Sequence, residues 1–374
     1  MKIRVMTVFG TRPEGIKMAP IIKVMEKVPE IENVICVTAQ HREMLDQVLN
    51  LFNIEPDYDL NIFKPGQTLT EITMRALEGL EKVIKEVKPD ILLVQGDTTT
   101  VFSGALAAFY QKVKIGHVEA GLRSGNLYSP YPEEANRKLT GILADFHFAP
   151  TKTNKENLLK EGYPEEKIFI TGNTVIDALQ YAVKEDYEFA IPLLNEIDFK
   201  NKKVILLTSH RRENIGKPME NIFSAVRDIT LKHEDVEVVF PIHLNPKVRE
   251  IAYKVFEGNN RIHLIEPLDY EPFTNLMARV HMVVTDSGGL QEEAPSLGKP
   301  VLVIREETER PEGIEAGTAK LVGTSYDKVY EEMDLLLSNQ EEYNKMANAV
   351  NPYGDGKASE RIVDIILKYG KKLI

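Results

Sequence analysis

Short runs of valine, isoleucine and leucine alternate with helical patterns along almost the whole of this 374-residue chain. Continuous apolar runs are typical of parallel strands that are buried on both faces. Alternating strands and helices indicate an α/β fold. The predicted strands form two series, Ile3–Phe9, Val34–Thr38, Ile91–Gln95, Lys114–Val118, Phe146–Ala149 and Ile168–Thr171, and then Val204–Thr208, Val236–Pro241, Ile262–Ile265, His281–Thr285 and Val301–Ile304.

A polar stretch of weak periodicity, residues 179–203, separates the two series of predicted strands. We therefore expect two domains, residues 1–172 and 173–357, with a C-terminal helix over 358–374 that can return to the N-terminal domain. Two α/β halves of similar size predict a cleft between them, where such enzymes commonly bind ligands. The predicted helices are Ile16–Lys27, Thr70–Val87, Val101–Tyr110, Pro218–Lys232, Pro246–Phe256 and Leu290–Leu297.

Composition excludes several classes of function. The net charge of −11 disfavours nonspecific binding to nucleic acid or to an anionic membrane, because both need an electropositive face. The single cysteine, Cys36, excludes a disulfide framework and a cysteine-based zinc site. No apolar stretch reaches the length of a membrane span, and the N-terminus has no signal-peptide cleavage pattern. These observations predict a soluble, cytoplasmic protein.

Charged residues follow the first predicted strand, in the segment Gly10–Lys17. Pro13 suits the first turn of a helix, so Arg12 and Lys17 are expected near a helix N-terminus, which attracts anions. The segment is neither a dinucleotide fingerprint nor a phosphate-binding loop of the common type. The alternative interpretation is an ordinary helix start with charges that face solvent.

Acidic residues follow three later segments of the first half. Asp97 follows the strand that ends at Gln95 and either takes part in chemistry or caps the next helix. Glu119 follows a strand that is expected to be buried, where a carboxylate is costly unless it is paired or functional. Glu133 and Arg137 lie four residues apart on one predicted helix face, so a surface ion pair is the alternative there.

The second half gathers basic residues and glycines after its strands. The segment His210–Asn214 carries a histidine and two arginines, which suit a phosphate group, although a solvated loop has the same composition. The turn Asp286–Glu293 contains two glycines before a helix, an arrangement that lets backbone amides approach a ligand. The other histidines, His41, His117, His147, His233, His243, His263 and His281, show no metal-ligand spacing, and we expect no metal site.

These segments, read together, resemble the non-hydrolysing UDP-N-acetylglucosamine 2-epimerases. The resemblance runs over nearly the whole chain and includes Asn351–Gly356 near its end. It rests on seven ordered blocks, Gly10–Lys17, Gln95–Thr100, His117–Arg123, Ser129–Arg137, His210–Asn214, Asp286–Glu293 and Thr308–Glu312. It implies two Rossmann-like domains that face a cleft, the glycosyltransferase B-type architecture, and a homodimer.

The resemblance also implies an activity. UDP-GlcNAc and UDP-ManNAc are interconverted when UDP is eliminated to leave 2-acetamidoglucal and is added back after reprotonation at C2, with no cofactor; UDP-ManNAc commonly serves polysaccharide synthesis. The residues that match the family's catalytic neighbourhood are Lys17, Asp97, Glu119, Glu133, Arg137 and His210. Those that match its UDP-binding set are Arg12, His210, Leu268, Phe273, Ser287, Gly288, Gly289, Glu293 and Arg310.

One departure from the family concerns regulation. Some bacterial members have a second, allosteric UDP-GlcNAc site near the segments that match Gln40–Glu43 and Pro65–Gln67. This chain has Glu43 and Gly66 where those members resemble glutamine and arginine. We expect an altered or absent effector response, because an added acid and a lost arginine weaken anion binding.

The alternatives to a non-hydrolysing epimerase are a hydrolysing 2-epimerase, a retaining glycosyltransferase and a nucleotide-sugar sensor.

Overall fold

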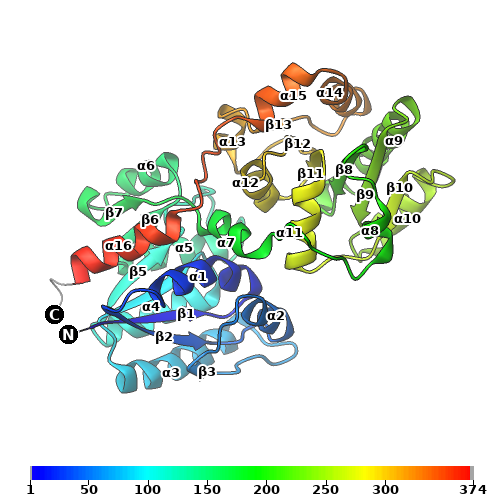
Figure 1. Ribbon diagram of the computed structural model, residues 1–374. Coiled ribbons are helices and arrows are strands. Elements are labelled where there is room, and N and C mark those ends of the chain that lie inside the picture. Colours follow the sequence, from blue (N-terminus) through cyan, green and yellow to red (C-terminus); the bar gives the residue numbers. More distant parts are fainter. Residues whose placement is uncertain (1, 371–374) are drawn as a thin grey trace. The chain divides into compact units, whose positions relative to one another are not determined.

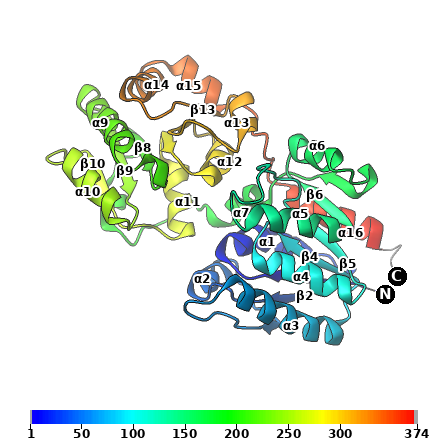
Figure 2. The same cartoon turned by 180° about the vertical axis from the view of Figure 1, so that it is seen from behind.

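The computed structural model describes residues 2–370, which form two compact units (Figures 1 and 2). The first unit holds the chain up to Tyr181 and from Tyr353 onward, and the second holds Ala182–Pro352. Both boundaries differ from the predicted ones, after residues 172 and 357. The reason is that helix α7 (Thr174–Ala182) belongs to the first unit, where the buried Asp177 accepts hydrogen bonds from the first backbone amides of α16 (Ala358–Gly370).

The first unit is a parallel sheet of seven strands in the order β3-β2-β1-β4-β5-β6-β7. Helix α4 packs against α3 and α5, and α1 packs against α2 and α16. The strands are β1 (Ile3–Phe9), β2 (Ile31–Val37), β3 (Tyr58–Asp59), β4 (Ile91–Gln95), β5 (Lys114–Val118), β6 (Phe146–Ala149) and β7 (Ile168–Ile170). The remaining helices are α1 (Arg12–Met25), α2 (Glu43–Leu51), α3 (Leu69–Val87), α4 (Thr99–Tyr110), α5 (Glu133–Leu143) and α6 (Lys152–Lys160), with a short 3₁₀ turn at Glu165–Lys167.

The second unit is a parallel sheet of six strands in the order β10-β9-β8-β11-β12-β13. Its strands are β8 (Lys203–Thr208), β9 (Val236–Pro241), β10 (Ile262–Ile265), β11 (Met282–Thr285), β12 (Val301–Val303) and β13 (Ala319–Leu321). Its helices are α8 (Pro192–Glu196), α9 (Lys217–Lys232), α10 (Pro246–Val255), α11 (Tyr270–Arg279), α12 (Gly288–Ser296), α13 (Pro311–Glu315), α14 (Tyr326–Ser338) and α15 (Gln340–Ala347), with a 3₁₀ turn at Arg212–Asn214.

The strand prediction is confirmed for every expected strand, with small shifts at the ends. Strands β3 and β13 were not predicted, because strands of two and three residues are too short to show a hydrophobic pattern. The core of each unit consists of apolar side chains from its sheet and covering helices, such as Leu92 and Val94 of β4 and Leu206 and Leu207 of β8, all of them fully buried. This burial on both sheet faces is why the strands show as unbroken apolar runs.

Each sheet has a point where the chain reverses its direction of travel along the strand order. In the first unit this point lies between β1 and β4, and in the second between β8 and β11. Loops at the carboxyl ends of the strands next to such a point diverge and leave room for ligands. The segments Gly10–Lys17 and Gln95–Thr100 lie there in the first unit, and His210–Asn214 and Asp286–Glu293 lie there in the second.

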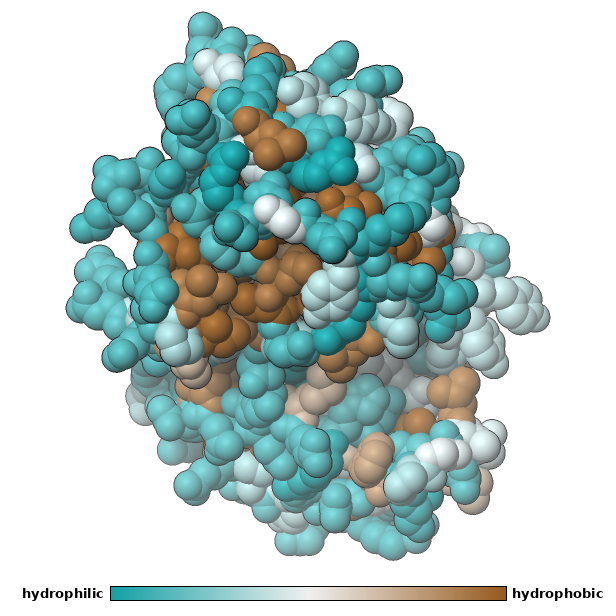
Figure 3. Space-filling model, turned by 90° about the vertical axis from the view of Figure 1, so that its right-hand side faces the viewer, coloured by the Kyte–Doolittle hydropathy of each residue, from teal (hydrophilic) through white to brown (hydrophobic). Residues whose placement is uncertain are grey.

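On the face drawn in Figure 3, hydrophilic side chains predominate and apolar ones show in groups between them. Among residues 2–370, no helix combines the length and the apolar character that crossing a bilayer requires.

Candidate active site

Glu119 occupies a strained position directly after β5. Its backbone φ is +64°, in the left-handed region that non-glycine residues rarely adopt and that costs free energy. The side chain is only 9% exposed, and its Oε2 lies 2.5 Å from Lys17 Nζ on helix α1. Gln95 donates a second hydrogen bond, from its Nε2, to the same oxygen. Because Gln95 and Val118 are register partners, the pairing of β4 with β5 aligns the strand ends that carry these groups.

Asp97 lies on the neighbouring loop and is bound by an arginine. Its Oδ2 accepts a hydrogen bond of 2.9 Å from Arg137 Nε and lies 2.6 Å from a second guanidinium nitrogen. The alternative that Asp97 caps helix α4 is wrong, since Thr98 is the cap and accepts from the Val101 amide. The guanidinium instead restrains the carboxylate at the carboxyl edge of the sheet.

Glu133 begins helix α5, and one oxygen of its carboxylate keeps free acceptor capacity. Its Oε2 is shielded from solvent and has no hydrogen-bond partner. The alternative of a Glu133–Arg137 surface pair is wrong, because Arg137 is buried and binds Asp97 and Glu134. A buried oxygen without a donor is costly, so this geometry is typical of a group that exchanges a proton or a hydrogen bond with a ligand.

Glu14 is a buried carboxylate that the sequence analysis did not single out. It is 2% exposed and accepts hydrogen bonds from the amides of Gly10 and Thr11, at 3.1 and 2.7 Å. Its other oxygen accepts from the Thr98 hydroxyl at 2.8 Å, which joins the loop after β1 to the loop after β4. Burial raises the pKa of the Glu14 carboxyl to about 7, although the hydrogen bonds from these neighbours oppose the shift.

The raised pKa of Glu14 predicts a pH-dependent stability. The folded state holds the Glu14 proton more tightly than the unfolded state does. The stability that this proton contributes to the folded state is therefore fully present below about pH 4.5, and it is lost as the pH rises to about 7. Glu14→Gln, which stays neutral, is expected to gain ~2–3 kcal/mol of unfolding free energy relative to the unmodified protein between pH 5 and pH 8. Urea unfolding of both proteins at the two pH values measures the gain, and a difference that stays constant with pH would contradict it.

In the second unit a fully buried carboxylate, Asp286, organises the loop after β8. Its Oδ1 lies 3.2 Å from His210 Nδ1, and the His210 side chain is 42% exposed. Burial alone raises the pKa of Asp286, but the donors around it hold that pKa below its ordinary value. The donors to Oδ2 are the Ser209 hydroxyl, the His210 and Arg211 amides and the Asn214 side chain.

The N-terminus of helix α12 presents two glycines. Ser287 precedes the helix, and a Cβ built on Gly288 would meet no atom within 4 Å, so the space beside this backbone is open. A Cβ on Gly289 would lie 3.3 Å from Glu293 Oε1, which places that carboxylate beside the same turn. The first amides of a helix lack partners within the helix and favour an anionic group.

The remaining residues of the expected UDP-binding set are dispersed. Arg310 precedes α13, and its Nε donates to the buried Glu292 of α12, so it is held near that helix. Leu268, which precedes α11, and Phe273, in its first turn, are half-buried. Arg12 begins α1 and lies in the first unit, whereas the other members of this set lie in the second. Among the described residues no cluster of three or more histidine, cysteine or carboxylate side chains could hold a metal ion.

Comparison with known proteins assigns the chain to a family. Residues 23–367 match the family described as UDP-N-acetylglucosamine 2-epimerase. The UDP-N-acetylglucosamine 2-epimerase of Bacillus subtilis is 58% identical over 370 residues, which cover 99% of this chain and 96% of that protein. The chain belongs to the UDP-N-acetylglucosamine 2-epimerase family.

Solved structures of family members have the same fold. The enzyme from Neisseria meningitidis bound to UDP-GlcNAc has a TM-score of 0.86 and 52% identity, over 98% of this chain and 100% of that one. The enzyme from Methanocaldococcus jannaschii in complex with UDP-GlcNAc and UDP has a TM-score of 0.77 and 38% identity, with the same coverage. The two parallel α/β sheets are therefore those of the epimerase family, a fold of the glycosyltransferase B type.

Proposed function

We propose that this protein reversibly converts UDP-GlcNAc into UDP-ManNAc without net hydrolysis. The reaction passes through elimination of UDP, which leaves 2-acetamidoglucal, and re-addition of UDP after C2 has been reprotonated. The bound ligands of the solved relatives, UDP-GlcNAc in one and UDP-GlcNAc with UDP in another, support this substrate class. The observation that supports this chemistry is the arrangement of Glu119. Its backbone is strained, and its nearly buried carboxylate contacts Lys17 and Gln95.

Residues of the second unit are proposed to bind the UDP. The open turn at Gly288 and the helix α12 that follows provide backbone amides for the diphosphate, and Arg310 and His210 provide positive or hydrogen-bonding groups. The C2 hydrogen is weakly acidic, so departure of the diphosphate has to drive the elimination. Donors directed at the leaving oxygens lower that barrier, because they stabilise the charge as it develops.

Residues of the first unit are proposed to move the protons. In the elimination, a base removes the C2 proton, the C1–O bond breaks and its electron pair leaves with the diphosphate. In the re-addition, an acid protonates the opposite face of C2 and the diphosphate oxygen attacks C1. Two faces require acid–base groups on two sides, and Asp97, Glu119 and Glu133 come from three separate segments, the loop after β4, the loop after β5 and the first residue of α5.

Proton NMR of the purified protein with UDP-GlcNAc in D₂O tests the proposal. We expect UDP-ManNAc with deuterium at C2 and no accumulation of free UDP. Free ManNAc together with UDP would establish the hydrolysing reaction instead. An unchanged spectrum, from protein shown by calorimetry to bind UDP, would reject the epimerase mechanism in favour of a transferase or a sensor.

We also propose that UDP-GlcNAc is not an allosteric effector here. Glu43 begins helix α2 beside Arg42, whose charge is already paired with Asp46 and Asp59, and Gly66 has no side chain to offer an anion. Equilibrium binding is expected to give one UDP-GlcNAc site per chain, and a hyperbolic rate dependence. Two sites per chain would contradict this.

The enzyme is further proposed to act as a homodimer. Light scattering is expected to give twice the chain mass of 42.3 kDa, and a monomer would exclude it.

A further inference from the structure

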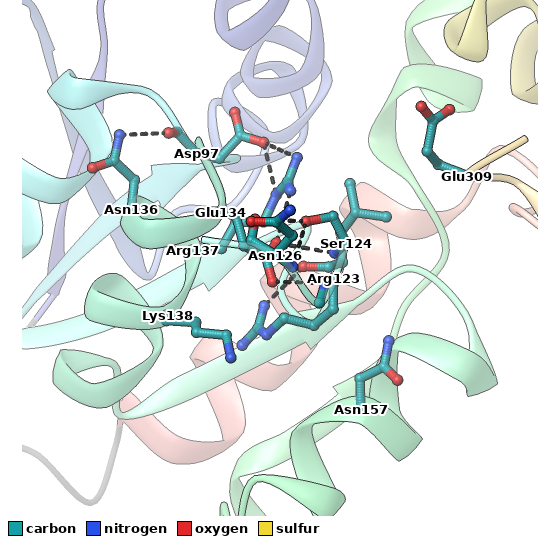
Figure 4. Close-up of polar contacts among 12 residues, drawn as sticks. Asp97, Arg123, Ser124, Asn126, Glu134, Asn136, Arg137, Lys138, Asn157 and Glu309 are labelled. Atoms are coloured by element: carbon teal, nitrogen blue, oxygen red, sulfur yellow. Dashed lines mark hydrogen bonds and ion pairs between the residues drawn. The ribbon is translucent and has the colours of Figure 1, made fainter. Parts of the chain in front are cut away.

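Glu134 is a fully buried carboxylate one residue beyond the expected catalytic Glu133 (Figure 4). Its Oε2 accepts hydrogen bonds from the Ser124 amide at 3.1 Å and from Arg137 Nη1 at 3.0 Å, and its Oε1 accepts from the Gly125 amide at 3.3 Å. A buried carboxylate costs several kcal/mol unless donors compensate for lost hydration. Three donors from two segments provide that compensation here, so the arrangement depends on the charge of Glu134.

Arg137 connects Glu134 to Asp97. The guanidinium donates a hydrogen bond from Nη1 to Glu134, and its Nε and Nη2 both face Asp97 Oδ2 (Figure 4). A planar guanidinium bound by carboxylates on two edges has its orientation determined by both. The neighbouring Asn136 donates from its side chain to the Asp97 backbone carbonyl at 2.9 Å. The first turns of α5 therefore restrain both the backbone and the side chain of Asp97.

We propose that Glu134 is a positioning residue, which orients the Asp97 carboxylate for the reaction through Arg137. The inference deepens the proposed function and rests on it. Without the Glu134 charge, Arg137 Nη1 loses its anionic partner and the guanidinium can rotate about its long side chain. Displacement of a catalytic group by about 1 Å can cost on the order of 100-fold in rate. UDP binding would not change, because Glu134, Arg137 and Asp97 are not among the residues expected to bind UDP.

Glu134→Gln tests the proposal, because the amide keeps the size and one acceptor but removes the charge. We expect kcat to fall about 10- to 100-fold, with KM and the Kd for UDP within about twofold of the unmodified protein. Glu134→Asp keeps the charge on a shorter side chain and should give a kcat between these two proteins. A kcat of Glu134→Gln within twofold of the unmodified value would overturn the proposal.

Glu161→Gln is the matched control. Glu161 binds Arg123 through two hydrogen bonds of 2.8 and 2.9 Å and so anchors the same loop, but its ion pairs are with Arg123 and Lys138, and not with the arginine that holds Asp97. We expect kcat within about twofold of the unmodified value. An equal loss of kcat in Glu134→Gln and in Glu161→Gln would assign both effects to the loop and would overturn the link to Asp97.

A double-mutant cycle that combines Glu134→Gln with Arg137→Lys gives a second, independent measurement. If the Glu134→Gln variant does not fold, Glu134→Asp replaces it in the cycle. If Glu134 acts through Arg137, the double variant will be no slower than Arg137→Lys alone. Losses that multiply would overturn the proposal. Each assay starts with the unmodified protein. If the unmodified protein shows no exchange at C2, the proposed function is rejected. If the unmodified protein exchanges normally and Glu134→Gln is equally active, only the inference about Glu134 is rejected.

Discussion

Glu119→Gln is expected to lower the epimerisation rate by about 10²- to 10⁴-fold, and Asp97→Asn is expected to do the same. The glutamine retains the size of the side chain but can no longer take up or release a proton at C2, and it replaces the charged carboxylate that Lys17 contacts. The Kd for UDP should stay within a few-fold, because neither residue is among those expected to bind UDP, all of which except Arg12 lie in the second unit. Deuterium incorporation at C2 measures the rate, and calorimetry measures UDP binding.

Glu32→Gln provides the control for the loss of one carboxylate from the first unit. Glu32 forms an exposed ion pair with Arg4 on the surface, where such pairs contribute little. Its turnover should match that of the unmodified protein. If Glu119→Gln or Asp97→Asn retained near-normal turnover, the role proposed for that residue would be wrong.

Gly288→Ala is expected to weaken UDP binding by about 10- to 100-fold while the fold remains intact. A Cβ at this position meets no atom within 4 Å, so the free protein tolerates a methyl group. Alanine at this position of α12 also reduces the freedom of the unfolded chain, which predicts an unchanged or slightly higher Tm. The methyl group occupies the space that the diphosphate needs to approach the helix amides, so the cost appears only on binding.

Gln340→Ala shortens an exposed side chain to the same methyl group at the first position of another helix of the second unit, α15. Its Kd for UDP should equal that of the unmodified protein. Calorimetric titration with UDP and thermal unfolding of all three proteins complete the test. Unchanged UDP affinity in Gly288→Ala would exclude this turn as the diphosphate site.

Much of the fold could be predicted from sequence because it follows from local burial. Strands that are covered by helices on both faces are apolar along most of their length, so β4 and β8 can be recognised in the sequence as continuous apolar runs. The two-unit organisation followed from the polar stretch between the two series. The exact boundary did not, because it depends on Asp177, which binds the first amides of α16 across 181 and 182 positions of sequence.

The candidate site shows the same division. Motif blocks pointed to Asp97, Glu119, Glu133 and the turn at Gly288, because residues at strand ends are where α/β folds place ligands. The partners of these residues could not be predicted. Arg137 is four residues from Glu133 but binds Asp97, 40 positions away, and Glu14 meets Thr98 across 84 positions.

The α/β class, the strand positions and the residue types that follow each strand could therefore be predicted from the amino-acid sequence, because they depend on local burial and on chain direction. The contacts between charged groups, the left-handed backbone of Glu119 and the full burial of Glu134 become visible only in the folded chain. They depend on a parallel sheet that brings distant strand ends into register, where low polarity makes each carboxylate depend on donors from other segments.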